Sequence, residues 1–216
     1  MENPRWKIVL LLSIVLLPVI AWLLITRGHN RFKHLPIIGP IEVAPNGDTL
    51  YHSVGTFQFV NQYGVPVTSD SLRGHIHIAN FFFATCKTIC PKMNEQVARA
   101  AEKYRDDKNV RFVSFTVDPE DDSVPVLRKY GEQFHADSLN WWFLTGNKDS
   151  IYSIARNGYL VPAAQGKTAG DFFHSQDLML IDKDFRIRGI YDGGEKLDVD
   201  TLIDEIRVLE LESLEK

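Results

Sequence analysis

Hydrophobic and polar positions follow three patterns along this chain. The run from Ile8 to Ile25 carries no charged residue and is mostly hydrophobic. Beyond it, short stretches alternate between hydrophobic and polar residues, as strands do, and longer stretches show helical spacing. The patterns predict strands near residues 56–60, 63–67, 75–83, 110–117, 141–144, 178–181 and 185–191, and helices near residues 91–104, 124–134, 150–157 and 199–211.

The order of these elements limits the fold. Strands alternate with helices first, and a hairpin followed by a helix closes the chain. This order predicts a mixed α/β sheet flanked by helices, in the βαβ…ββα arrangement of a thioredoxin-like fold. The chain beyond the first hydrophobic run is long enough for one domain with a sizeable core, which we expect over residues 47–216.

The first hydrophobic run has the length of a membrane span. At 1.5 Å per residue, a helix from Ile8 to Ile25 is about 27 Å long, close to the thickness of the hydrocarbon core. Trp6 and Trp22 lie near its ends, and Arg27 follows it in place of the small residues of a cleavage site. We therefore expect one uncleaved N-terminal transmembrane helix over residues 8–26, a cytoplasmic tail over 1–7 and a linker over 27–46.

Charge patterns narrow the location and the partners. Basic residues flank the first hydrophobic run on both sides, so they leave its orientation open. The seven residues before it leave no room for a mitochondrial transit peptide, which favours a bacterial protein. Only five of the 24 basic and one of the 28 acidic residues lie within residues 1–35, so the remainder carries a formal charge of −8. This acidic domain argues against nucleic acid as a partner.

Cys86 and Cys90, the only cysteines, lie between a predicted strand and a predicted helix. A disulfide over so short a ring would contribute only about 2 kcal/mol through loop entropy, which favours chemistry over a structural staple. Pro91 as the first helical residue would place Cys90 near a helix N-terminus, where the thiolate is favoured, and Lys87 would add to this effect. Thiolates serve both disulfide exchange and metal binding, so this local field does not choose between them.

Spacing and ligand chemistry narrow these roles. The C-x-x-x-C spacing is one residue wider than that of dithiol oxidoreductases, and no C-x-x-C-H motif for c-type haem is present. Two thiolates suit Cu(I) better than tetrahedral zinc, and a histidine is the natural third ligand. Among the seven histidines, His174 follows a glycine-rich stretch that could bring it to the thiols. From spacing alone, an ordinary loop histidine remains the default, and His75 and His77 are expected to be surface or partly buried.

Four segments, in their order along the chain, resemble motifs of the Sco/SenC family. These are residues 80–83 of the strand, the motif Cys86-x-x-x-Cys90-Pro91-x-Met93, the stretch from Ser114 to Asp122, and Phe173-His174-Ser175. The likeness extends over about residues 57–208, although Lys87 and Thr88 depart from the residues often found between the thiols. The family consists of membrane-tethered copper proteins with a thioredoxin fold that help to assemble cytochrome c oxidase.

The resemblance implies a function and a ligand set. It implies that Cys86, Cys90 and His174 bind a copper ion, with Cu(I) as the main candidate and Cu(II) as the second, for delivery to the subunit that carries the CuA site. It also implies a single-pass protein of the bacterial inner membrane whose domain faces the periplasm. The main alternative is a thiol–disulfide oxidoreductase that reduces the cysteines of the oxidase copper site, with a thiol reductant protein as a second candidate partner. A redox or copper sensor is a third hypothesis.

Two further residues near the thiols have competing interpretations. Asp118 either orients the cysteine loop or contacts a partner, or else belongs to a turn before the next helix, which Ser123 could cap. The turn is the favoured interpretation. Met93 is expected in the core, although a thioether is also a weak copper ligand.

Overall fold

The computed structural model describes residues 13–20, 22, 34–136, 140–161 and 175–214. The chain divides into two units, residues 1–34 and 35–216. Within the first unit, residues 13–20 are helical. Among the described residues, no helix combines the length and the hydrophobicity that crossing a bilayer requires. About half of the expected span over residues 8–26 lies outside the described residues.

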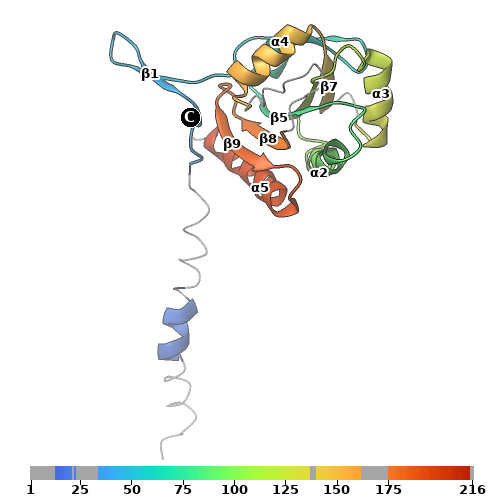
Figure 1. Cartoon of the computed structure of the whole chain (residues 1–216). Coiled ribbons are helices and arrows are strands. Elements are labelled where there is room, and N and C mark those ends of the chain that lie inside the picture. The colour runs from blue at the N-terminus through green and yellow to red at the C-terminus, as the bar shows by residue number, and fades with distance from the viewer. Residues whose placement is uncertain (1–12, 21, 23–33, 137–139, 162–174, 215–216) are drawn as a thin grey trace, which may run out of the picture. The chain divides into compact units, whose positions relative to one another are not determined.

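A seven-stranded sheet forms the centre of the second unit (Figure 1). Its strand order is β4-β3-β7-β6-β5-β8-β9, in which β5, β6 and β7 are parallel and the remaining pairs are antiparallel. The strands are β3 (Gln58–Asn61), β4 (Pro66–Thr68), β5 (Ile76–Phe82), β6 (Val110–Thr116), β7 (Trp141–Thr145), β8 (Asp177–Ile181) and β9 (Ile187–Asp192). The predicted mixed α/β sheet is therefore confirmed, and β5 lies near its middle.

Helices cover both faces of this sheet. The elements are α2 (Ile89–Lys103), α3 (Val124–Gln133), α4 (Lys148–Ser153), a π-helical turn (Ile154–Gly158), α5 (Lys196–Glu212) and a short 3₁₀ helix (Ser69–Leu72). Side chains of α2, α3 and α5 pack in one hydrophobic cluster with Ile78 and Phe82 of β5. Side chains of α4 and the π-helical turn pack in a second cluster with Ala79 and Phe81, because successive residues of a strand face opposite sides.

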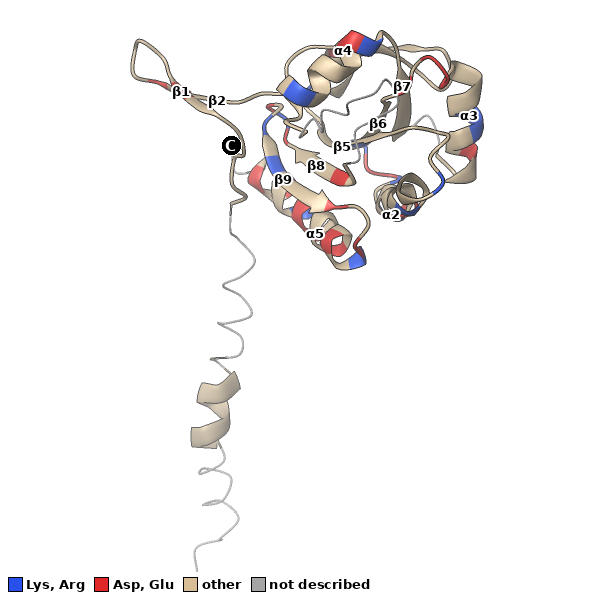
Figure 2. Cartoon of the chain, viewed as in Figure 1, with Lys and Arg blue, Asp and Glu red and all other residues tan. Residues whose placement is uncertain are grey.

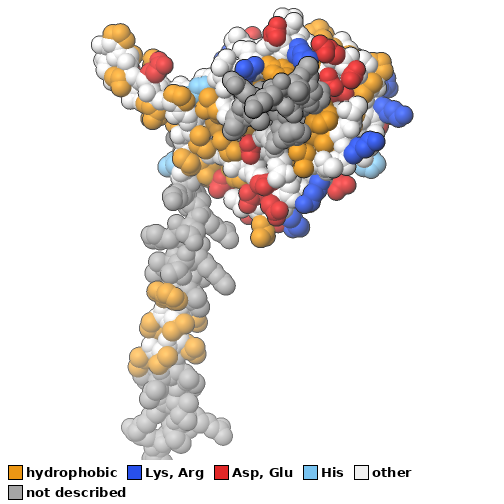
Figure 3. Space-filling view, in the orientation of Figure 1, with side chains coloured by type: hydrophobic (Ala, Val, Ile, Leu, Met, Phe, Trp, Pro, Cys, Tyr) orange, Lys and Arg blue, Asp and Glu red, His pale blue; other side chains and the backbone are white. Residues whose placement is uncertain are grey.

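Most predicted elements are present, and the differences have local causes. A hairpin of β1 (Ile41–Val43) and β2 (Thr49–Tyr51) precedes the sheet and was not predicted, because strands of three residues show almost no alternation. Its hydrophobic side chains are exposed (Figure 3). Ser123 occupies the N-cap position of α3, but its side chain makes no capping hydrogen bond.

Acidic side chains lie on the surface of the second unit rather than in one cleft. Figure 2 shows several of them along α5, in which Asp204 is exposed and Asp200 and Glu205 are half-buried. Asp200 forms an ion pair with Lys196 and another with Arg99 of α2, so part of this charge is neutralised locally. The acidic surplus therefore belongs largely to a solvated surface.

Candidate functional site

The two cysteines lie where β5 leads into α2. Residues 83–88 form the connection, and Cys90 is the second residue of the helix. Both side chains are buried, with 8% of Cys86 and 4% of Cys90 exposed, and both are free thiols. The backbone N–H of Cys90 donates to the sulfur of Cys86 over 3.5 Å. The structure thus brings the two predicted thiols together at the N-terminus of α2.

The two thiols differ in acidity. Burial raises the pKa of Cys86, but hydrogen bonds from the backbone and side chains of Cys90 and Thr88 outweigh it, so the pKa lies below its ordinary value. For Cys90, burial dominates, and with the nearby Cys86 it raises the pKa to about 12. Cys86 is therefore the residue that is readily a thiolate, and Cys90 is the thiol beside it.

This asymmetry corrects the prediction that Cys90 carries the favoured thiolate. The helix begins at Ile89, two residues before Pro91, so Cys90 lies inside the first turn and its side chain is buried. The sulfur of Cys86 instead lies before the helix, where an unpaired backbone N–H group can reach it. The predicted effect of a helix N-terminus is present, but it acts on the other cysteine. Lys87 is exposed.

A chain of buried polar side chains joins the first turns of α2 to the sheet. Asn80 of β5 donates to Asn94 of α2 over 3.0 Å, and Asn94 donates to the hydroxyl of Tyr130 in α3 over 3.0 Å. Ser114 of β6 donates to Asn80 and accepts from Trp141. Buried polar groups that are fully paired hold their elements in one arrangement. This network therefore fixes the helix that carries Cys90.

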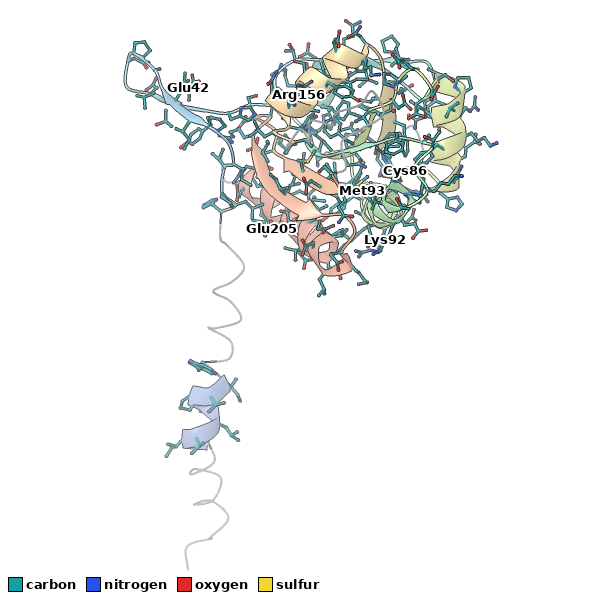
Figure 4. All side chains as sticks on the ribbon, in the orientation of Figure 1. Glu42, Cys86, Lys92, Met93, Arg156 and Glu205 are labelled. Atoms are coloured by element: carbon teal, nitrogen blue, oxygen red, sulfur yellow. The ribbon has the colours of Figure 1, made fainter. Side chains whose placement is uncertain are left out.

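Met93 belongs to the core, as predicted. It is 1% exposed, and its sulfur accepts a long contact of 3.8 Å from the amide of Asn80. Figure 4 shows Cys86 and Met93 beside α2. The sulfur of Met93 thus has a packing environment and a protein partner of its own.

The acidic stretch after β6 contributes a residue that the sequence did not single out. Asp122 is fully buried, and one carboxylate oxygen, Oδ2, accepts hydrogen bonds from the backbone N–H of Ala84 and from the hydroxyl of Thr116. Asp118 forms the predicted turn, because its carbonyl oxygen accepts from the N–H groups of Asp121 and Asp122. The residue that touches the cysteine loop is therefore Asp122.

His174 lies outside the described residues. Gln176 is described, and its carbonyl oxygen accepts from the N–H of Gly193 over 2.8 Å. A Cβ on Gly193 would lie 2.8 Å from both this oxygen and the Cγ of Met93, so three segments meet without space for a side chain. The chain just after His174 therefore passes beside Met93, one helical turn beyond Cys90.

The other candidate histidines lie elsewhere. His77 is completely buried on the face of β5 that packs against α4, which corrects the expectation of a surface or partly buried residue. It has that environment because β5 is covered on both faces, and alternation alone does not reveal a second covered face. His75 lies before β5, at the end of the strand opposite to the cysteines.

Sequence reasoning missed Thr88 and Asp122. Thr88 was visible only as part of the loop, but hydroxyl residues before a helix are common caps, and here its hydroxyl lies 3.9 Å from the sulfur of Cys86. Asp122 was visible within the acidic stretch. No spacing rule could separate it from its acidic neighbours, because its role depends on the strand pairing of β5 with β6.

The described residues permit two kinds of chemistry. No cluster of three or more histidine, cysteine or acidic side chains suited to a metal occurs among them. Two adjacent sulfurs, one readily a thiolate, fit a soft ion of low coordination number and fall short of the four donors of structural zinc. The same pair, a readily formed thiolate with a neighbouring thiol, also fits disulfide exchange.

Comparisons with known proteins agree with this geometry. The SCO1/SenC family model matches residues 46–209. A SCO1 protein homolog of Bacillus subtilis is 31% identical over 162 residues, which cover 74% of this chain and 84% of that protein. The structure of BsSco, a Sco-family cytochrome c oxidase assembly protein with a disulfide switch, is 30% identical with a TM-score of 0.64, covering 74% of this chain and 94% of that one. Copper-bound ScoI of Arabidopsis thaliana is 29% identical with a TM-score of 0.59, covering 73% and 98%.

Proposed function

This chain belongs to the SCO1/SenC family, and we propose that it is a copper metallochaperone of the bacterial inner membrane. Cys86, Cys90 and His174 bind the copper ion, and the protein delivers it to the CuA centre of cytochrome c oxidase during assembly. Copper is the cargo in this proposal. The copper-bound Arabidopsis relative supports the cargo, and the assembly role named for BsSco supports the partner.

The observation that carries the proposal is the pair of unlike thiols at the N-terminus of α2. Cys86 is ready to bind a cation as a thiolate, and Cys90 adds a second sulfur when the metal displaces its proton, which is released to solvent. Because both side chains are buried, the sulfurs are protected from competing solvent. A partner's thiolates can then replace them one at a time, which is the chemistry that transfer requires.

The path of the chain after His174 supports the third ligand. Gln176 lies against Gly193, which packs against Met93. Gln176 thus lies near the first turns of α2, which supports His174, two residues earlier in the sequence, as the proposed third ligand. An imidazole completes a three-coordinate site for Cu(I).

The membrane anchor is proposed from the sequence. The uncharged run over residues 8–26 has the length of a span. The N–H of Leu35 donates to Glu212, and its carbonyl oxygen accepts from Arg188. These bonds hold the start of the domain to α5 and β9, and an anchor before it would keep the domain near the membrane that holds the oxidase.

The experiment is a Cu(I) titration of the reduced full-length protein in detergent micelles, against a chelator that competes for Cu(I). We expect affinity well tighter than micromolar, and a loss on His174→Ala. His75→Ala is the matched control, because about 20 Å of β5 separates His75 from the cysteines. Micromolar or weaker binding contradicts the proposed function, and equal affinities of the two histidine variants contradict the ligand set.

The difference in acidity between the thiols also favours a second function, thiol–disulfide exchange. The Cys86 thiolate attacks a disulfide of the target and forms a mixed disulfide, releasing one target thiolate. Cys90, after losing its proton, attacks the sulfur of Cys86 and releases the second, so the target gains two electrons and Cys86–Cys90 becomes a disulfide. An external dithiol must then reduce this disulfide.

Variants separate the two functions. Reduction of an oxidised copper-site dithiol should stop with either Cys86→Ser or Cys90→Ser and continue with His174→Ala. Copper binding should require all three residues. A protein that cannot reduce such a dithiol, even with an external dithiol as donor, lacks the second function.

A further inference from the structure

Asp122 is a buried carboxylate whose contacts join three segments. It is fully buried just before Ser123, the N-cap residue of α3. Its Oδ2 atom accepts from the N–H of Ala84 over 3.0 Å and from the hydroxyl of Thr116, the last residue of β6. The Oδ1 atom has no hydrogen-bond partner among the described residues. A buried carboxylate is costly unless its bonds hold something in place.

The position of Asp122 explains why a bond is needed there. The pairing of β5 with β6 ends at Phe82 and Thr116, and the last backbone bond runs from the N–H of Val117 to the carbonyl oxygen of Phe82. Beyond this bond the two segments of the chain separate. The segment after β5 leads to Cys86, and the segment after β6 leads to the acidic turn. The carboxylate of Asp122 bridges the two segments, because it accepts one hydrogen bond from Ala84, after β5, and one from Thr116, at the end of β6.

The bond to Ala84 acts on the backbone two residues before Cys86. Ala84 is followed by a turn in which the N–H of Cys86 donates to the carbonyl oxygen of Phe83 over 3.2 Å. The sulfur of Cys86 must then meet the N–H of Cys90 at the start of α2. A loop held at Ala84 and at α2 has little freedom to move that sulfur.

We propose that Asp122 is a positioning residue for the copper site, which holds the loop before Cys86 against the end of β6 and so sets the geometry of the two sulfurs. The inference deepens the proposed function and rests on it for the metal. Among the described residues, Asp122 makes no hydrogen bond to either sulfur, and its charge is a minor contribution to the raised pKa of Cys90, after burial. Groups that orient metal ligands from behind alter metal affinity by about 10- to 100-fold when they are removed.

Two substitutions at this position separate the hydrogen bonds from the charge. Asp122→Ala removes the acceptor, while Asp122→Asn keeps an oxygen that accepts from both donors and removes the charge. Asp121→Asn is the matched control, because it removes the same charge from an exposed residue of the same turn. Thermal unfolding of each variant identifies those that remain folded at the temperature of measurement.

The first measurement is copper affinity, with the thiolate-to-Cu(II) charge-transfer band as the spectroscopic readout. In the full-length protein, Asp122→Ala should lower Cu(I) affinity about tenfold and shift the band. Asp122→Asn and Asp121→Asn should stay within about threefold of the wild type and keep the band. Wild-type affinity in Asp122→Ala, or an equal loss in Asp122→Asn, overturns the proposal.

The second measurement needs no metal and separates failure of this inference from failure of the proposed function. Hydrogen exchange at the amides of Ala84 and Cys86 in the reduced apo-protein should accelerate at least tenfold in Asp122→Ala and change little in Asp122→Asn. If the wild type binds no copper but these amides respond as stated, the loop-positioning role is supported and the copper function is wrong. If the amides do not respond, the positioning role is wrong whether or not copper binds.

Discussion

Two buried polar side chains in this protein each leave one atom unpartnered among the described residues. His77 lies on the face of β5 that packs against α4, and its Nε2 atom is 3.2 Å from the hydroxyl of Tyr159, with Nδ1 unpartnered. Asp122 lies beyond the other end of that strand and accepts two hydrogen bonds, one of them from the loop that leads to Cys86. Both are completely buried.

The comparison shows that burial and an altered pKa do not identify a functional residue. His77 is surrounded by Phe185, Tyr159 and other aromatic and aliphatic side chains, and burial lowers its pKa to about 3. The hydroxyl that its Nε2 atom meets belongs to Tyr159, another core residue. Asp122 is bonded to the backbone beside a reactive thiol, so its geometry reaches the chemistry. The two residues differ in what they contact: His77 contacts core side chains, and Asp122 is bonded to the loop that leads to Cys86.

The largest predicted contrast is in copper affinity. Cys86→Ser or Cys90→Ser should lower Cu(I) affinity by more than about 100-fold, the upper range for groups that only support ligands, because each removes a sulfur donor. His77→Gln should leave it within about threefold, since His77 faces the other side of the sheet. Chelator competition measures both. A comparable loss in His77→Gln would show that the two regions are coupled.

The next contrast lies within the cysteine region itself. Cys86 should react with iodoacetamide at least roughly 30-fold faster than Cys90 at pH 8, because a lower pKa means more thiolate and this outweighs the accompanying loss of nucleophilicity. The rate for Cys86 should also reach half its maximum at a lower pH than for an ordinary cysteine. Peptide mass spectrometry of the reduced protein gives both rates. Faster labelling of Cys90 would restore the sequence prediction.

His77 should affect the pH dependence of the free energy of unfolding and leave copper binding unchanged. Its pKa is lowered in the folded state, so the unfolded chain takes up a proton that the folded protein refuses, and stability falls as pH drops from about 6.5 toward about 3. At pH 5 this loss amounts to about 2 kcal/mol relative to neutral pH. Urea unfolding at pH 7 and at pH 5 should show this loss of unfolding free energy in the wild type and in His75→Gln. If the unfolding free energy of His77→Gln falls with pH as steeply as that of the wild type, His77 is not the cause of the loss.

The smallest contrast removes one hydroxyl from each region. Tyr159→Phe should cost about 1 kcal/mol in the free energy of unfolding, since it deletes one hydrogen bond to a buried group. Thr116→Val should cost about 2 kcal/mol, since the hydroxyl of Thr116 both donates to Asp122 and accepts from the N–H of Asp118. Only Thr116→Val should also weaken Cu(I) binding, by severalfold, because Asp122 then keeps the Ala84 bond alone. Urea unfolding measures the free energy of unfolding of both variants, and chelator competition on the same samples measures their Cu(I) affinity. Equal effects of the two variants on copper would remove the distinction between the regions.

The sequence was informative wherever a single local pattern decides the structure. Alternation predicted β5 and β6, and helical spacing predicted α2, α3 and α5, each within a few residues of their observed ends. The position of the cysteines between a strand and a helix followed from the same patterns. The prediction failed over which thiol is activated, because a helix start two residues earlier moves Cys90 inside the first turn.

Other features depend on contacts between distant segments. Asp122 meets Ala84, 38 residues away, only because β5 and β6 pair in parallel. His77 is buried because α4 and the π-helical turn cover the second face of β5, a fact that no local pattern of that strand contains. The ligand role of His174 stays a prediction from the family resemblance.

X-ray absorption at the copper edge of the Cu(I)-loaded, reduced full-length protein tests the central claim most directly. The account predicts two sulfur scatterers and one imidazole nitrogen in the wild type, with loss of the nitrogen in His174→Ala and its retention in His75→Ala. A wild-type spectrum with two sulfurs and no nitrogen, or one unchanged by His174→Ala, would contradict the proposed site.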